Sequence, residues 1–472
     1  MKKNVLYSLI LTLSAYAVPL LVFPYTSRVL GPAAIGATDW MESIVNYSIL
    51  FSMMGMSTLG IREIARCKGD CEATSRVFSE LFMLNSLSTA FVVGGLLLIS
   101  LTTDLLSSNP ALFRLGLVKI VFNLFWIEWY YKGIENFRYI TIRSVIVRCL
   151  FVASVYLFVN DSSDYVIYYL LWVGVTVANA VCNWSYRSQS VRLVPLRQLR
   201  FTYWRPFLLL GLYAVFSAVY TQLNTTVLGV VSSHSEVAYY STAARIYTVL
   251  IAIFSTFTSV MIPRMSALIA EQRTAEVKHL VYRAFDVLFM LMLPIIVYVE
   301  AYADGIICLF AGDAFVPSAA ILRVLIFQLL IIGAEQIFIL QLLIPARKDR
   351  QALWCAVLGA IVCVVANVLL VRRFQGMGSA FTWLFSELAV LMLASVWVKR
   401  YFSISLPLRQ LLISVVYALP YVGLVWAVSG IEPVLLRLGV SGVCFVVWAI
   451  VLEEYVYKFN LLKGLYSRIR RR

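Results

Sequence analysis

Long apolar stretches alternate with short polar segments along the whole chain. A helix needs about 20 mostly apolar residues to cross the roughly 30 Å hydrocarbon core of a membrane. We predict fourteen such spans, at about residues 5–27, 40–61, 80–101, 112–131, 144–159, 165–186, 207–231, 237–262, 284–303, 319–344, 353–371, 379–398, 411–428 and 434–452. The gaps between them are too short for a globular domain. The pattern therefore predicts an all-α polytopic membrane protein.

Composition and charge agree with this interpretation. Of the 472 residues, 61% are hydrophobic and 13% are charged, whereas a soluble domain is about 25% charged. The net charge of +15 arises from 39 Lys and Arg against 24 Asp and Glu. With Lys2 and Lys3 placed in the cytoplasm, thirty of the 39 basic residues fall on predicted inner segments, and three (Arg28, Arg372 and Arg373) fall on outer ends. This bias predicts an even number of spans with both termini cytoplasmic, and it explains the charge without nucleic acid.

A short motif recurs along the chain. Residues 29–31 and 227–229 both read Val-Leu-Gly, near the outer end of a predicted span, and each motif is followed by a short outer loop. Parallel repeats are typical of transporters, with the substrate site between the halves. We predict an N-terminal six-helix bundle over 1–200, a second one over 201–400, and a last region over 401–472 with spans 13 and 14 and a basic cytoplasmic tail.

Charged residues inside the spans are the first functional candidates, because a charge in hydrocarbon costs about 2.5–3.5 kcal/mol on insertion scales. Arg28 follows Pro19 and Pro24, which disturb the first helix, and Arg245 lies too deep in the eighth span to reach the inner surface. A cavity lined by both arginines would attract a phosphate or diphosphate. The alternative is that such charges pair with each other or extend to the surface, as we expect for Arg148 near a span end.

Polar residues concentrate in spans 1, 2, 7 and 8. Gln222 and Asn224 make the seventh span too polar to face lipid, and Tyr240 belongs to a polar face at the start of the eighth. We therefore expect these side chains to line a polar cavity.

Two acidic residues lie one turn apart near the start of the second span. Asp39 and Glu42 share a helix face and are candidates for a proton- or cation-coupling site. They could equally be ion-pair partners of Arg28. Lys119 is a further cation within a predicted span.

Several other features of the sequence say less about function. The segments at about 186–206 and 264–283 are basic and amphipathic, so they are expected on the inner surface, either against anionic lipids or as charged linkers. Cys67 and Cys71 lack the nearby ligands of a zinc site, and no metal, cofactor or catalytic residue is predicted. The first apolar run continues to Phe23, so we expect an uncleaved first span rather than a signal peptide.

Three stretches carry a family resemblance: FPYTSRVLGPAAIGATDW at 23–40, GIREIAR at 60–66 and QLNTTVLGVVSSHSEVAYYSTAARIY at 222–247. They resemble the polysaccharide-repeat-unit flippases of the Wzx (O-antigen exporter) type. These belong to the multidrug/oligosaccharidyl-lipid/polysaccharide exporter superfamily. In that family the position of Asn224 is often Asp, so a carboxylate is missing here and a coupling role at this position is in doubt.

The resemblance implies a function. It implies a flippase, not an enzyme, that moves undecaprenyl-diphosphate-linked oligosaccharides from the inner to the outer leaflet of the bacterial cytoplasmic membrane by alternating access, for O-antigen or capsule assembly. Arg28 and Arg245 would contact the head group, with Lys119 and Arg62 as weaker candidates. Spans 13 and 14 would help to hold the lipid tail. Proton or sodium coupling and contact with the polysaccharide polymerase machinery would be consistent with this role.

Two alternatives are weighed against this function. A multidrug antiporter of the same superfamily would favour acidic residues over arginines in its cavity. A membrane-embedded glycan polymerase, ligase or glycosyltransferase would need a sizeable catalytic loop, and the predicted outer loops are short, with no metal-binding carboxylate cluster and no Ser/His/Asp set.

Overall fold

The computed structural model describes residues 2–67, 70–103, 109–187, 191–195, 202–428 and 434–451. Regular structure in these ranges is helical, and they contain no strand. Ten helical stretches within them are long and apolar enough to cross a membrane, which confirms the all-α polytopic class, while the count of fourteen stays a prediction. The predicted basic tail beyond residue 451, and residues 188–190 and 196–201 of the predicted surface segment, lie outside the described residues.

Two compact units make up the chain, residues 1–241 and 242–472. The boundary falls inside one helix, α9 (His234–Ala270). The predicted division into six-helix halves rests on the sequence duplication rather than on packing, and it stays a prediction.

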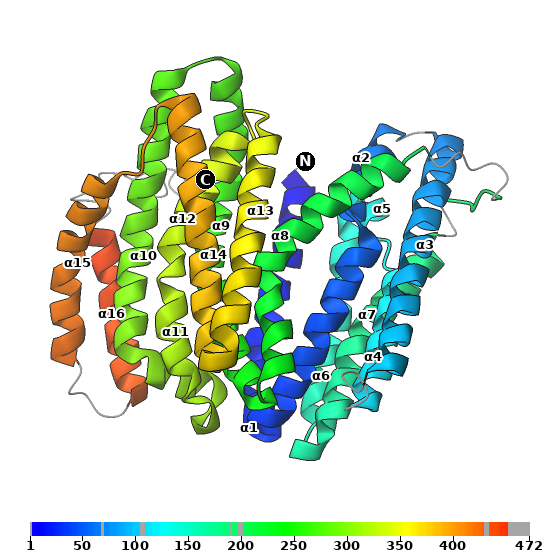
Figure 1. Cartoon of the computed structure of the whole chain (residues 1–472), viewed down its shortest axis with the longest axis horizontal. Helices are drawn as coiled ribbons and strands as arrows, with labels where there is room; N and C mark the ends of the chain where they lie inside the picture. Colours follow the sequence, from blue (N-terminus) through cyan, green and yellow to red (C-terminus); the bar gives the residue numbers. More distant parts are fainter. Residues whose placement is uncertain are drawn as a thin grey trace. The chain divides into compact units, whose positions relative to one another are not determined.

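Unit 1 contains eight complete helices among its described residues (Figure 1). They are α1 (Lys2–Met53), α2 (Met56–Arg66), α3 (Cys71–Thr102), α4 (Pro110–Asn123), α5 (Glu128–Gly133), α6 (Phe137–Phe158), α7 (Tyr165–Arg187) and α8 (Trp204–Val231). Local signals set several helix starts. Asp70 caps α3 by accepting hydrogen bonds from the amides of Glu72 and Ala73 at 2.9 and 3.0 Å, and Pro110 begins α4, where a proline lacks only an N–H that would be unpaired anyway.

Helix α1 is bent into two arms at Gly31. Gly31 has φ 76° and ψ 173°, a region that is essentially restricted to glycine. Pro32 follows it, and a proline disfavours a helical conformation in the residue before it. The first predicted span therefore lies in one arm of α1, whereas the second begins in the other arm and continues past Met53 into α2.

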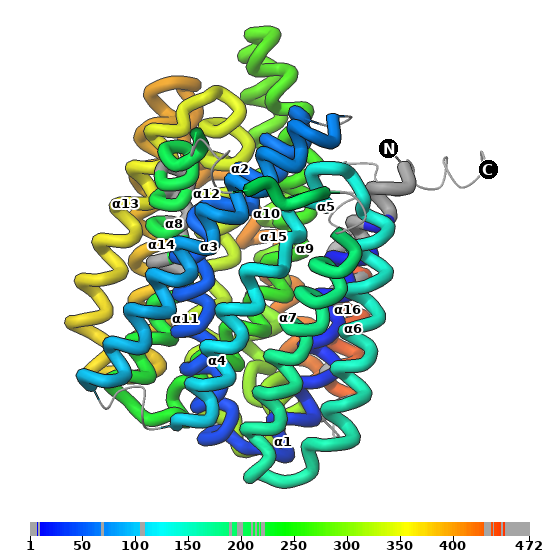
Figure 2. Tube along the Cα trace, turned by 90° about the vertical axis from the view of Figure 1, so that its right-hand side faces the viewer, coloured from blue at the N-terminus to red at the C-terminus, as the bar shows by residue number. Residues whose placement is uncertain are grey.

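Helix α1 is the centre of unit 1, where it packs against α3, α4, α6 and α8. Helices α4 and α6 each pack against α7, and Figure 2 shows α4, α7 and α6 running side by side. An aromatic core with Phe78, Trp129 and Tyr130 joins α2, α3 and α5. Gly60 allows this packing, because a Cβ atom there would lie 2.4 Å from the ring of Trp129.

Unit 2 holds most of α9 and the remaining helices. They are α10 (Thr274–Ala311), α11 (Ser318–Ile326), α12 (Gln328–Phe338), α13 (Asp349–Ala366), α14 (Arg372–Phe402), α15 (Leu408–Val428) and α16 (Val434–Val451). Helix α10 packs against α11 and α12 and also against α15 and α16, which Figure 1 shows beside it. The hydroxyl of Tyr302 on α10 donates to the carbonyl of Val425 on α15 at 3.0 Å. The last two helices are therefore attached to this unit through α10.

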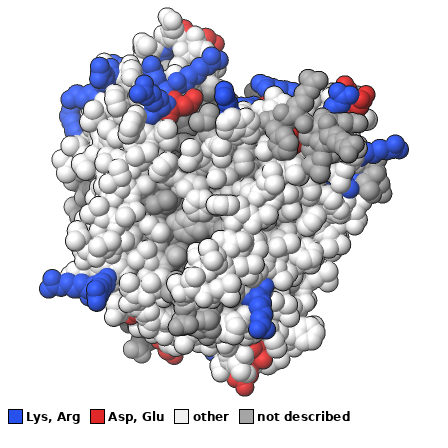
Figure 3. All heavy atoms as spheres, turned by 45° about the vertical axis from the view of Figure 1, so that its right-hand side comes forward, with Lys and Arg blue, Asp and Glu red and all other residues white. Residues whose placement is uncertain are grey.

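Exposed apolar side chains cover the outward faces of many helices. Phe91 is 84% exposed and Trp426 is 79% exposed. On the face drawn in Figure 3, charged residues collect toward the top and the bottom of the view, and the described surface between them is almost uncharged. A water-exposed surface of this kind would be unfavourable, whereas it matches the hydrocarbon core of a membrane.

Candidate functional site

Polar side chains of α1 and α8 face each other inside unit 1. The indole N–H of Trp40 donates to the carbonyl of Thr226 at 3.2 Å, and the Thr226 hydroxyl donates to Ser43 Oγ at 2.9 Å. Nearby, the amide of the fully buried Asn224 donates to the Tyr240 hydroxyl at 3.4 Å. These contacts explain why the predicted spans 2, 7 and 8 are less apolar than the rest.

The backbones at this junction approach very closely. A Cβ atom at Gly229 would lie 2.0 Å from the Trp40 ring, and a Cβ atom at Gly36 would lie 1.6 Å from the carbonyl oxygen of His234. The repeated Val-Leu-Gly motif thus serves two different purposes. Gly31 makes a bend, whereas Gly229 allows close helix packing.

Asp39 and Glu42 have different partners despite their spacing. The Asp39 carboxylate accepts a hydrogen bond from the Ser241 hydroxyl on α9. Glu42 points toward α4 and α7, where it forms an ion pair with the buried Lys119 and accepts from the Trp172 indole N–H at 3.3 Å. The two acids therefore lie in separate surroundings, and Glu42 is paired with Lys119 rather than with Arg28.

A small cavity of about 330 Å³ lies next to this ion pair. Both arms of α1 contribute to its wall, through Pro19 and Asn46, and so do α4, α6 and α7. Asn123 and Asn179 line it, and Asn46 is exposed at its rim. Predicted candidates Glu42 and Lys119 are thus brought to one cavity, together with polar residues that the sequence analysis did not single out.

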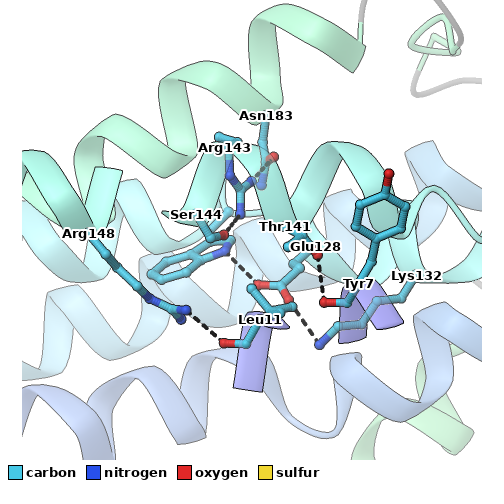
Figure 4. A network of polar contacts seen from close by, with 10 residues as sticks. Tyr7, Leu11, Glu128, Lys132, Thr141, Arg143, Ser144, Arg148 and Asn183 are labelled. Carbon is cyan, nitrogen blue, oxygen red and sulfur yellow. Dashed lines mark hydrogen bonds and ion pairs between the residues drawn. The ribbon is translucent and has the colours of Figure 1, made fainter. Parts of the chain in front are cut away.

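A hydrogen-bond network ties the first arm of α1 to α6 beside this cavity (Figure 4). The Arg148 guanidinium donates to the carbonyl of Leu11 at 2.8 Å and to the Ser14 hydroxyl. The Thr141 hydroxyl donates to the carbonyl of Tyr7 at 2.9 Å. The position of Arg148 near a span end predicted that its side chain extends to the surface. Instead, it hydrogen-bonds to α1 within unit 1.

The other predicted cations are not among the residues that line this cavity. Arg28 is exposed in the first arm of α1, and its guanidinium donates to the carbonyl of Pro24 one turn earlier. Arg62 is exposed on α2, with its Nε 2.7 Å from Glu63. Arg245 is half-buried on α9 in unit 2, and Gln222 is exposed on α8.

Unit 2 contains a pair of buried carboxyl groups. Glu335 on α12 and Glu387 on α14 hydrogen-bond to each other. Glu387 also accepts from the Trp383 indole N–H at 2.9 Å. Two carboxyl groups in direct contact cannot both be ionised, so they share at least one proton.

Several polar residues of unit 1 could not be identified as site residues from the sequence. Trp172, Asn123 and Asn179 carry no charge, and nothing in their local sequence separates them from other polar residues in apolar helices. Only the contact between α1, α4 and α7 brings them together. Among the described residues, no group of three His, Cys, Asp or Glu could hold a metal ion.

Polar and charged side chains buried among helices of membrane-spanning length are typical of membrane transporters. Residues 1–269 match the family described as polysaccharide biosynthesis proteins, and the chain belongs to that family. Two relatives, from Escherichia coli (strain K12) and Shigella dysenteriae, are each named "Putative O-antigen transporter". Both are 20% identical to this chain, over 85% and 83% of its length and over 97% and 98% of their own.

Solved structures show the same fold. A lipid II flippase, MurJ, in an inward closed conformation covers 95% of this chain and 99% of its own, with a TM-score of 0.76 and 13% identity. An inward-facing MATE family multidrug resistance transporter of the MOP superfamily covers 83% of this chain and 94% of its own, with a TM-score of 0.63 and 16% identity. The predicted resemblance to Wzx-type flippases is confirmed by the family match and by the two relatives, and these relatives and solved structures are transporters or flippases, not enzymes.

Proposed function

We propose that the protein is a flippase for undecaprenyl-diphosphate-linked oligosaccharide repeat units. It would move them from the inner to the outer leaflet of the bacterial cytoplasmic membrane by alternating access, for O-antigen or capsule assembly. The observation that carries this proposal is the match to polysaccharide biosynthesis proteins, together with two relatives named for O-antigen transport. Polar and basic residues within otherwise apolar helices support it, because such a cargo has a polar head that must cross hydrocarbon.

The cationic residues suit the anionic part of this cargo. We assign Arg28 and Arg245 to the diphosphate, because a guanidinium binds phosphate oxygens through two parallel hydrogen bonds. Arg62 and Lys119 are weaker candidates, since both already form ion pairs with glutamates. Gln222, Asn224 and Tyr240 would provide uncharged polar contacts.

A coupling ion would use a carboxylate of α1. Lys119 compensates the charge of Glu42, which makes Asp39 the stronger candidate for binding a proton or a sodium ion. With both termini in the cytoplasm, the basic segment around 186–206 would lie against anionic lipids of the inner leaflet. Helices α15 and α16 would help to hold the lipid tail, and the polysaccharide polymerase machinery is a candidate partner for the delivered product.

The test is genetic complementation in the source bacterium with the gene deleted. The wild-type chain should restore surface polysaccharide. Arg28→Ala and Arg245→Ala should each lower it by about tenfold or more, because a lost charge-assisted contact is worth about 1.5–3 kcal/mol. Arg114→Ala is the matched control, since Arg114 is an exposed arginine of α4.

Immunoblots of isolated membranes would show that every variant is present in equal amounts. Full polysaccharide with both Arg28→Ala and Arg245→Ala would contradict the assigned head-group contacts. Restoration of drug efflux in place of surface polysaccharide would contradict the flippase itself and favour a multidrug antiporter.

A further inference from the structure

The cavity of unit 1 has a size that suits a ligand of one ring. Its volume of about 330 Å³ is at the lower end of small-molecule pockets, which span about 300–1,000 Å³. It is enclosed by both arms of α1 and by α4, α6 and α7. A space of this size admits a single sugar ring with its hydroxyl groups, but not a whole oligosaccharide repeat unit.

Two buried amides of the wall have hydrogen-bonding atoms that no protein group satisfies. Asn123 is 8% exposed and its Nδ2 has no partner, while Asn179 is 2% exposed and its Oδ1 has no partner. The Nδ2 of Asn179 donates to the carbonyl of Val175 at 2.6 Å, which fixes this amide with its oxygen unused. A buried polar atom without a partner is unfavourable, so a ligand that both donates and accepts hydrogen bonds fits this pair.

Aromatic rings complete the wall. Trp126 and Trp172 line the cavity, and each is held by its indole N–H, which donates to Glu128 at 3.0 Å and to Glu42 at 3.3 Å, respectively. A sugar ring has apolar C–H faces and a rim of hydroxyls. Fixed aromatic surfaces beside unpaired amides match both parts of that chemistry.

Charge argues against a cation at this place. The carboxylate of Glu42 is compensated by Lys119, and the guanidinium of Arg148 also lines the cavity. The three groups together carry one positive charge, which repels sodium ions and cationic drugs. A neutral sugar or one with a carboxylate is compatible with this balance.

We propose that this cavity is a saccharide subsite that binds one sugar residue of the transported glycan, with Asn123 and Asn179 as hydrogen-bonding groups and Trp126 and Trp172 as ring contacts. The proposal rests on the flippase function proposed above. It places a specific sugar contact within unit 1, in addition to the arginine contacts assigned to the diphosphate.

The test is saturation-transfer-difference NMR on the full chain in lipid nanodiscs. The probes are glucose, N-acetylglucosamine, galactose and glucuronic acid. The wild-type chain should transfer saturation to at least one of them, and the double variant Asn123→Leu/Asn179→Leu should lose at least about tenfold in affinity for that sugar. Asn85→Leu is the matched control, because Asn85 is also a buried asparagine of unit 1 with an unpaired amide oxygen, but it lies outside the cavity.

Thermal unfolding separates a binding role from a structural one. Asn123→Leu removes an unpaired donor, so the variant should unfold at the same or a higher temperature than the wild type. A strong loss of stability would assign a structural role to Asn123 and contradict the proposal, as would sugar binding by the double variant equal to wild type, or no transfer to any probe.

Failure of this proposal and failure of the flippase function give different results. If the double variant restores surface polysaccharide fully and binds the probes like wild type, the subsite is wrong and the flippase stands. If the chain binds a sugar at this cavity but supports no surface polysaccharide, the flippase function is wrong.

Discussion

Gly36 and His234 touch backbone to backbone, although 198 residues separate them. A Cβ atom at Gly36 would lie 1.6 Å from the carbonyl oxygen of His234. This contact joins the second arm of α1 to the start of α9 within unit 1. Because the obstructing atom is backbone, it cannot move aside as the end of a flexible side chain could.

Gly36→Ala should therefore weaken unit 1. Overpacking of a tight contact costs about 1–3 kcal/mol, and we expect a lower unfolding temperature for the purified protein in detergent. Gly94→Ala is the control, since a Cβ atom there meets nothing within 4 Å and alanine is favoured over glycine in a helix by about 1 kcal/mol. Equal stability of Gly36→Ala and wild type would show that the two backbones do not meet.

Alternating access predicts that the junction of α1 and α8 separates during transport. Ser43 Oγ and Thr226 Oγ1 lie 2.9 Å apart, so cysteines at both positions should form a disulfide on mild oxidation in a background without the native cysteines. The oxidised Ser43→Cys/Thr226→Cys variant should lose transport of lipid-linked oligosaccharide, and a reductant should restore it. Ser43→Cys alone should be insensitive to oxidation. Full transport by the crosslinked protein would mean that this junction stays closed throughout the cycle.

The shared proton of Glu335 and Glu387 makes a prediction about stability. Glu335→Gln keeps a donor facing Glu387 and should unfold close to the wild-type temperature. Glu335→Ala leaves a buried carboxyl group without this partner and should cost about 1–3 kcal/mol. Thermal unfolding of both variants measures the difference. If glutamine is as destabilising as alanine, the two groups do not share a proton.

Cys67 should react slowly with maleimide at neutral pH. Partial burial and the carboxylates of Glu63 and Asp70 raise the pKa of the Cys67 thiol, and only the thiolate reacts. The labelling rate should rise as the pH increases toward this raised pKa. Glu63→Gln removes one negative charge, which lowers the pKa and speeds labelling at pH 7. The rates can be followed by mass spectrometry, and an unchanged rate in Glu63→Gln would refute the electrostatic cause.

Hydropathy predicted the helical class because hydrocarbon imposes a length on every span. It predicted helix ends less well, since helices continue into the polar regions. The predicted span 284–303 lies within α10, which runs from Thr274 to Ala311. Likewise, the residues around Gly31 were expected to form a loop, but the helix resumes directly after this glycine.

The candidate site was only partly predictable for a related reason. Isolated charges such as Lys119 are visible in an apolar sequence, because their burial is costly. Which charges pair with each other cannot be read from the sequence. Glu42 lies 77 residues before Lys119 and meets it only through packing of α1 against α4. A functional role for Asn123 and Asn179 becomes apparent only from the cavity that both residues line.

At the bend, the two arms of α1 are joined through Gly31 without a loop between them. One arm carries Arg28 and the other carries Trp40 and Glu42. Because the connection is a single residue, a displacement of the first arm at Gly31 also moves the start of the second arm. A cargo bound through its diphosphate at Arg28 and through a sugar at the cavity would therefore contact both arms of the same helix.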